Sequence, residues 1–229
     1  MGNAEGDSTG RAALERAQES QDDLVLVYQP IHDAETREIY AVEALLRQRR
    51  ESGELREASL IMKAAERGPS ADLFLFDSML VKKAYTDAAR WQARDVTVRL
   101  NINLSPREFQ EGNVLPRLTD LVTGCGIDTH KINLEITETS YIKDPEGTVH
   151  VLDELRELGL ELWLDDFGTG HSSITHLQHF PLNGVKIPGA FVSGLGDEDA
   201  RCRKITAAIV RLAHDLGLKV IAEEIEEEQ

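Results

Sequence analysis

Acidic residues stand inside or at the end of several short apolar runs of the sequence. Glu43 lies in YAVEALL and Glu135 in INLEIT, while Asp165 and Asp166 end LWLDD and Glu223 follows VIA. A carboxylate in a buried strand costs free energy unless it is paired or binds a metal ion. Any one of these acids taken alone fits a helix cap or a surface salt bridge. Their occurrence in four separate runs instead predicts one shared site.

The same residues could form a metal centre if their strands are parallel. The carboxyl ends of parallel barrel strands meet at one face, where these acids would be joined by Asn103 of NINLS. Oxygen ligands of this kind suit Mg²⁺ and Mn²⁺ better than zinc. Lys186, in the run GVKI, could neutralise surplus carboxylate charge or orient an attacking water. Taken alone, Lys186 fits a structural ion pair and Asn103 fits a turn or cap.

A glycine-rich segment, DFGTG, begins at Asp166 and is followed by His171 and Ser172. As a connection from a strand to a helix it could present backbone N–H groups to a phosphate. A tight turn followed by a serine N-cap explains the segment equally well. A lone loop histidine such as His171 is more often a bystander than a general acid or base.

Short apolar runs alternate with longer amphipathic segments from Asp23 onward, which predicts an α/β fold of repeated βα units around a parallel sheet. Residues 1–22 are polar and small and are interpreted as a flexible leader or linker, before one domain at 23–229. Glycines at 126, 159 and 217 are expected to end helices. The expected strands are Leu24–Pro30, Glu38–Leu46, Val96–Leu104, Lys131–Thr137, Leu160–Asp165, Gly184–Ile187 and Lys219–Ala222. The expected helices are Ala58–Arg67, Ala71–Arg94, Val114–Thr123, Thr148–Leu158, Ser172–His179 and Ala200–Leu216.

The composition argues against several classes of partner. A formal net charge of −16 opposes non-specific binding to nucleic acid or to an anionic membrane, so DNA is not expected as a partner. A phosphate-bearing substrate would need clustered basic residues or metal ions. The sequence has only two cysteines and no run approaching the roughly 18 apolar residues of a membrane span, and it lacks a secretory signal. A cytoplasmic location is therefore predicted.

The order of the motifs resembles that of EAL-domain cyclic di-GMP phosphodiesterases, from about Leu24 to Glu226. The resemblance rests on YQPI at 28–31, EALLR at 43–47, NINLS at 101–105, EITE at 135–138, DDFGTG at 165–170, VKI at 185–187 and IAE at 221–223. It implies a TIM-type (β/α)8 barrel and hydrolysis of one phosphodiester of cyclic di-GMP to linear pGpG. It also implies two Mg²⁺ or Mn²⁺ ions, with Ca²⁺ inhibitory.

The resemblance further implies a role for individual residues. Lys186 matches a lysine that positions the water nucleophile, with Glu43 and Glu223 also at the catalytic centre, and Glu138 would hold the DFGTG loop. Arg47 would contact a phosphate, for which the guanidinium is well suited. The substrate-binding set is Gln29, Leu46, Arg47 and Asp166, and the metal-site set is Glu43, Asn103, Glu135, Asp165, Asp166 and Glu223.

The sequence departs from the family pattern at several positions. His171 stands where the family usually has tyrosine, Asn183 and Pro188 where it has aspartate, and Glu224 where it has glycine. Loss of a carboxylate at Pro188 is expected to weaken metal binding or to shift Lys186. The sequence stops at Gln229, so we expect a barrel without its last strand and helix. Either the chain is truncated, or an assembly completes the barrel between chains. The resemblance suggests a homodimer, and the polar leader would suit a link to a sensory or GGDEF domain.

Three functions remain open from the residues. The leading hypothesis is a metal-dependent phosphodiesterase specific for cyclic di-GMP. The second is a degenerate EAL domain that binds cyclic di-GMP or a protein partner without hydrolysis, as Pro188 and Glu224 would suggest. The third is a metallophosphodiesterase acting on another nucleotide or phosphoester, which the carboxylates alone would permit.

Overall fold

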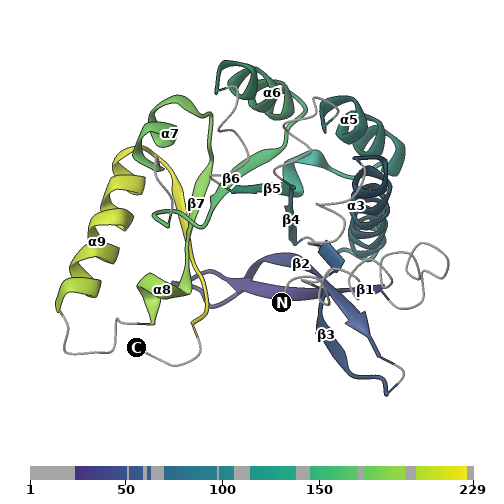
Figure 1. Cartoon of the computed structure of the whole chain (residues 1–229), viewed down its shortest axis with the longest axis horizontal. Coiled ribbons are helices and arrows are strands. Elements are labelled where there is room, and N and C mark those ends of the chain that lie inside the picture. The colour runs from purple at the N-terminus through teal and green to yellow at the C-terminus, as the bar shows by residue number, and fades with distance from the viewer. Residues whose placement is uncertain are drawn as a thin grey trace, which may run out of the picture. The chain divides into compact units, whose positions relative to one another are not determined.

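A computed structural model describes residues 24–50, 52–58, 61–62, 70–96, 98–105, 114–137, 145–169, 173–193 and 200–225. The chain divides into two compact units. The N-terminal unit takes its described residues from Met1–Ile102 and Arg117–Ile127, and the C-terminal unit takes them from Asn103–Pro116 and Asp128–Gln229. Figure 1 labels most of the helices and strands of both units. The expected leader at 1–22 lies outside the described residues.

The N-terminal unit is built on an antiparallel pair of strands. Strand β1 (Leu24–His32) pairs with β2 (Ile39–Arg49) along nearly its whole length. The short β3 (Leu55–Glu57) pairs antiparallel with the C-terminal end of β2. Strand β4 (Arg99–Asn103) runs parallel to β2 and ends at the boundary between the units. Helices α3 (Ser70–Gln92) and α5 (Val114–Cys125) complete the elements described for this part of the chain.

The direction of β1 corrects the expectation of a parallel sheet throughout. The connection 33–38 is too short for the crossover that a parallel pair requires, so the chain makes a hairpin. The Asp33 carboxylate stabilises this turn by accepting hydrogen bonds from the backbone N–H groups of Glu35 and Thr36. These bonds lower the pKa of Asp33, because they favour its ionised form.

The C-terminal unit carries four parallel strands in the order β5–β6–β7–β8. They are β5 (Ile132–Thr137), β6 (Glu161–Asp165), β7 (Gly184–Ile187) and β8 (Lys219–Ala222). Helices α6 (Pro145–Glu157), α7 (Ser173–His179) and α9 (Ala200–Asp215) lie along one side of these strands in Figure 1. A 3-10 helix, η2 (Thr129–Lys131), precedes β5, and a short helix, α8 (Gly189–Val192), follows β7.

The central strands of the C-terminal unit are apolar apart from a few polar residues and are buried on both faces. All but the last residue of β5 and every residue of β7 are buried, which is typical of parallel strands covered on both sides. The expected helix ends at Gly126, Gly159 and Gly217 are confirmed, since each adopts a positive φ that favours glycine. None of the helices described is long and apolar enough to span a membrane.

The predicted elements agree with the structure except in their ends and in three short segments. The bounds of β7 and β8 are as expected, and the ends of the other elements shift by at most three residues. The short elements η2, β3 and α8 were not expected. Most of the expected helix Ala58–Arg67 lies outside the described residues, as does Ser172 at the start of the expected helix Ser172–His179.

Candidate metal and phosphoester site

Lys186 lies at the centre of a cluster of carboxylates in the C-terminal unit. Its Nζ is 2.9 Å from Glu135 Oε2, 2.7 Å from Glu223 Oε1 and 3.5 Å from Asp165 Oδ1. The side chains of Lys186 and Glu135 are 1% and 0% exposed, whereas those of Asp165 and Glu223 are 15% and 25% exposed. Lys186 and Glu135 are therefore shielded from water, whereas water reaches Asp165 and Glu223.

Each member is placed by the end of a different parallel strand. Asp165 ends β6, Lys186 lies near the end of β7, and Glu223 follows β8 directly. The backbone N–H of Glu223 donates to Ile187 O at 3.0 Å, which extends the β7–β8 pairing to the carboxylate itself. Because the strands are parallel and in register, their carboxyl ends bring these side chains together, as the sequence predicted.

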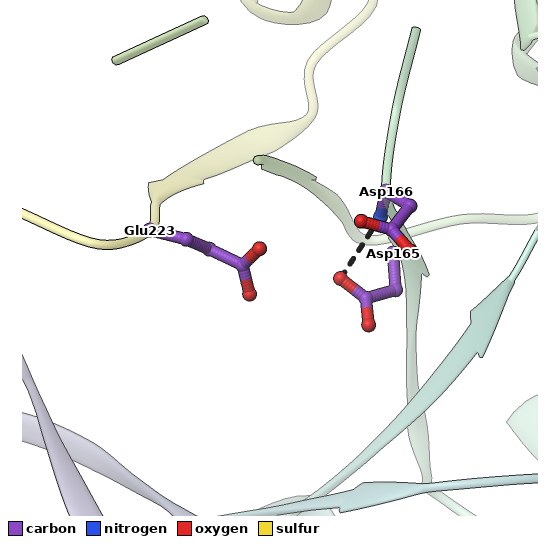
Figure 2. Close-up of side chains that lie close together, drawn as sticks. All are labelled: Asp165, Asp166 and Glu223. Atoms are coloured by element: carbon purple, nitrogen blue, oxygen red, sulfur yellow. Dashed lines mark hydrogen bonds between the residues drawn. The ribbon is translucent and has the colours of Figure 1, made fainter. Parts of the chain in front are cut away.

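The turn after β6 places a second aspartate beside the first. Asp166 adopts φ 55°, and its backbone N–H donates to Asp165 Oδ1 at 2.9 Å, which Figure 2 shows as a dashed line. The next residue, Phe167, is buried, and its N–H donates to Lys186 O at 3.1 Å. The start of the DFGTG segment is therefore tied to the strand that carries Lys186, while Gly170 and His171 lie outside the described residues.

The electrostatics of the cluster favour a bound cation. Partial burial raises the pKa of Asp166, and the neighbouring Asp165 carboxylate raises it further, while Lys186 opposes both effects. The Lys186 ammonium group lies within 3.5 Å of the Glu135, Asp165 and Glu223 carboxylates and also interacts electrostatically with Asp166, so four carboxylates surround one positive charge. Excess negative charge at a partly buried site is costly, and a divalent cation would relieve it.

Three of the carboxylates fit a metal ion by geometry as well as charge. One oxygen from each of Asp165, Asp166 and Glu223 lies within 4.8 Å of the others. Figure 2 shows the Glu223 carboxylate directed towards the two aspartates. An all-oxygen donor set of this kind suits Mg²⁺ or Mn²⁺.

Two residues at the start of β7 that the sequence did not assign to the site stabilise the neighbouring strands. A Cβ built on Gly184 would clash with the ring of the buried Trp163, so the indole requires glycine at the start of β7. Asn183 accepts a hydrogen bond from Leu162 N–H through its Oδ1 at 2.9 Å. The departure at Asn183 is thus explained, because an amide oxygen supplies the acceptor that a carboxylate would offer.

The other predicted site residues lie on other strands or outside the described residues. Asn103 is exposed and precedes Leu104, whose N–H donates to Glu135 O at 2.9 Å, so its backbone lies beside β5 in the same unit. Gln29 stands opposite Glu43 in the β1–β2 register, within the N-terminal unit. In that unit Arg47 donates from NH1 to Leu46 O at 2.9 Å. Glu138 lies outside the described residues.

Comparisons with known proteins agree on one family. The EAL domain model matches residues 11–229. The "Cyclic di-GMP phosphodiesterase PA2567" of Pseudomonas aeruginosa is 32% identical over 214 residues, which are 93% of this chain and 36% of that protein. The "Cyclic di-GMP phosphodiesterase PdeR" of Escherichia coli is 30% identical over 221 residues, 96% of this chain and 32% of that protein. The chain thus spans about a third of the length of these curated relatives.

Solved structures are similar over nearly the whole chain. The "PaMucR Phosphodiesterase, c-di-GMP complex" superposes with a TM-score of 0.87 at 27% identity, covering 96% of this chain and 88% of that one. The cAMP and cyclic-di-GMP bound form of the "EAL Enzyme Bd1971" gives a TM-score of 0.89 at 25% identity, covering 100% and 61%. The α/β fold predicted from the sequence is therefore confirmed, and the chain belongs to the EAL domain family.

Proposed function

We propose that this EAL domain is a metal-dependent phosphodiesterase that hydrolyses cyclic di-GMP to linear pGpG. In this reaction a water oxygen bonds to one phosphorus, the bond from that phosphorus to the 3′ oxygen breaks, and the 3′ oxygen takes up a proton. The observation that carries the proposal is the convergence of three carboxylates, those of Glu135, Asp165 and Glu223, on the buried Lys186 at one edge of the parallel strands. Two relatives named cyclic di-GMP phosphodiesterases support the choice of substrate.

The carboxylates are proposed to hold two Mg²⁺ or Mn²⁺ ions, with Ca²⁺ as an inhibitory substitute. The proposed metal-site residues are Glu43, Asn103, Glu135, Asp165, Asp166 and Glu223. A bound divalent cation would supply Lewis-acid stabilisation of the charge that develops on the phosphate oxygens. The acidic residues would thereby serve an anionic substrate in a chain whose net charge is −16.

Lys186 is proposed to position the attacking water. Its ammonium group has three donors, and two of them face Glu135 and Glu223 at hydrogen-bonding distance. These contacts fix the position of the ammonium group, so a water that binds beside it would keep a constant orientation towards the phosphorus. We assign Glu43 and Glu223 to the same catalytic centre, and Glu138 to holding the DFGTG loop.

The substrate-binding role is proposed for Gln29, Leu46, Arg47 and Asp166. Arg47 is suited to a phosphate oxygen, because a guanidinium offers paired donors in a fixed plane. Its NH1 already donates to Leu46 O, which orients the guanidinium while leaving further N–H donors.

A receptor function without hydrolysis is the second candidate, and Pro188 favours it. Pro188 is the N-cap of α8, makes no side-chain cap bond and puts no carboxylate beside the cluster. In that case the domain would bind cyclic di-GMP through the same residues and leave it intact.

Turnover separates the two candidates. Purified protein with Mn²⁺ or Mg²⁺ should convert cyclic di-GMP to pGpG, and Glu43→Ala should abolish this, with binding measured in Ca²⁺. Metal-independent binding without product at high enzyme concentration would favour the receptor. Competition by unlabelled nucleotides tests the choice of cyclic di-GMP over another phosphoester.

The wider setting is proposed from the length of the relatives and the composition. Because this chain spans about a third of the relatives, a sensory or GGDEF domain in the same protein is consistent with their length. We propose a cytoplasmic homodimer, which sedimentation of the purified chain and fractionation of cells would test.

A further inference from the structure

The residue after Glu223 has an unusual backbone conformation. Glu224 adopts φ 54°, and only three other non-glycine residues of the described ranges have a positive φ. One of them is Asp166, which likewise follows directly on a carboxylate of the cluster. This conformation costs a non-glycine residue about 1–3 kcal/mol and persists only where surrounding contacts stabilise it. The turn after β8 must therefore gain something from the glutamate.

The Glu224 side chain fills the space directly above Gly189, the first residue of α8. A Cβ built on Gly189 would lie 2.6 Å from Glu224 Cδ and 2.8 Å from Glu224 Cβ, and closer still to Oε2. Any other residue at 189 would displace the glutamate. Within the part of the chain that the structure describes, the Glu224 carboxylate joins no metal-binding group, in contrast to Glu223. Its contact with the molecule is one of packing.

This packing contact lies just beyond the ends of β7 and β8, close to the cluster. Lys186 and Glu223 meet at 2.7 Å, and the N–H of Glu223 donates to Ile187 O. Glu224 is the next residue after Glu223, and Gly189 is the second residue after Ile187. Helix α8 is itself fixed, because Thr206 Oγ1 of α9 donates to Phe191 O at 2.9 Å.

We propose that Glu224 is a positioning residue, whose side chain rests on Gly189 and holds the turn after β8 so that the Glu223 carboxylate faces Lys186 and the two aspartates. The role depends on the shape of the side chain and not on its charge. The inference rests on the proposed function, since it takes Glu223 as a metal ligand. Residues that orient a metal ligand typically contribute about 10-fold or more to metal affinity.

Three variants of the full chain test the proposal by Mn²⁺ calorimetry and thermal unfolding. Glu224→Gly should weaken Mn²⁺ binding by about 10-fold without lowering the unfolding temperature, because glycine relieves the positive φ. Glu224→Gln keeps the shape and should bind Mn²⁺ like the wild type. Gly189→Ala should lower the unfolding temperature, and adding Glu224→Gly should restore it while Mn²⁺ affinity stays low.

The outcomes distinguish this proposal from the proposed function. Unchanged Mn²⁺ affinity in Glu224→Gly, or equal weakening in Glu224→Gln, would overturn the positioning role alone. Failure of Glu224→Gly to rescue Gly189→Ala would overturn the packing contact on which it depends. If the wild-type chain itself bound no Mn²⁺, the proposed function would fail and the positioning role with it.

Discussion

Replacing Lys186 by methionine tests the balance of charge in the cluster. The change keeps an unbranched side chain but removes the Nζ that lies 2.9 Å from Glu135 Oε2 and 2.7 Å from Glu223 Oε1. Glu135 is fully buried at its side chain, so water cannot replace the lost ammonium group there. The Glu223 and Asp165 carboxylates remain accessible to water, so removal of the ammonium group destabilises them less.

The expected loss of stability follows mainly from Glu135. Removing one partner of a buried ion pair costs about 3–5 kcal/mol, because the other charge is left uncompensated. For a chain of this size each kcal/mol corresponds to about 2–4 °C in Tm, so Lys186→Met should lower Tm by about 10 °C in metal-free buffer. Added Mn²⁺ should narrow this difference, since it would neutralise the same carboxylates.

Urea and thermal unfolding in EDTA provide the measurement, with Lys219→Met as the matched control. Lys219 also lies on a strand of the C-terminal unit and pairs with Glu161 at 3.3 Å, but its side chain is 50% exposed. An exposed pair contributes only about 0–1 kcal/mol. Equal losses in the two variants would refute the reasoning. If Lys186→Met does not fold, adding Glu135→Gln should recover the native state by removing the uncompensated charge.

Three further changes have definite expected results. Asn183→Ala removes the acceptor of the Leu162 N–H and should cost about 1–3 kcal/mol in urea unfolding, whereas Asn183→Asp keeps an acceptor and should cost less; equal losses would contradict the assigned bond. Gly184→Ala places a Cβ against Trp163 and should cost at least about 1–3 kcal/mol, with an altered near-ultraviolet circular dichroism signal; an unchanged spectrum and stability would count against this packing. Mn²⁺ at about 100 times its Kd should stabilise the chain by about 2.7 kcal/mol, reversibly with EDTA, and no shift would argue against the metal site.

The elements around the site were predictable because their sequences are strongly patterned. The run GVKI gave the bounds of β7, and VIAEE gave the end of β8, since apolar runs bounded by glycine or charge mark buried strands. The hairpin of β1 and β2 was not predicted, because an apolar run does not reveal the direction of its neighbour. That direction is decided by the length of the connection 33–38, and the expected strands already left only residues 31–37 between them, too few for a crossover.

The grouping of the acids was predictable, whereas the contacts within the group were not. The positions of Glu135, Asp165 and Glu223 in or directly after apolar runs predicted that they lie at one edge of the sheet. Which of them would pair with Lys186 depends on register and side-chain conformation, and the sequence specifies neither directly. The need for glycine at 184 was likewise hidden, because it follows from an indole on the neighbouring strand.

Pro188 and Glu224, which both depart from the family pattern, affect the same part of the structure. From the sequence, Pro188 was expected to weaken metal binding or to shift Lys186, yet Lys186 lies within 3.5 Å of three carboxylates two residues before it. Glu224 meanwhile packs on Gly189, the residue directly after Pro188. The two departures thus meet at one junction of β7, α8 and β8. Since Lys186 pairs with Glu135 and Glu223, we expect Pro188 to affect turnover mainly through the charge that it fails to supply.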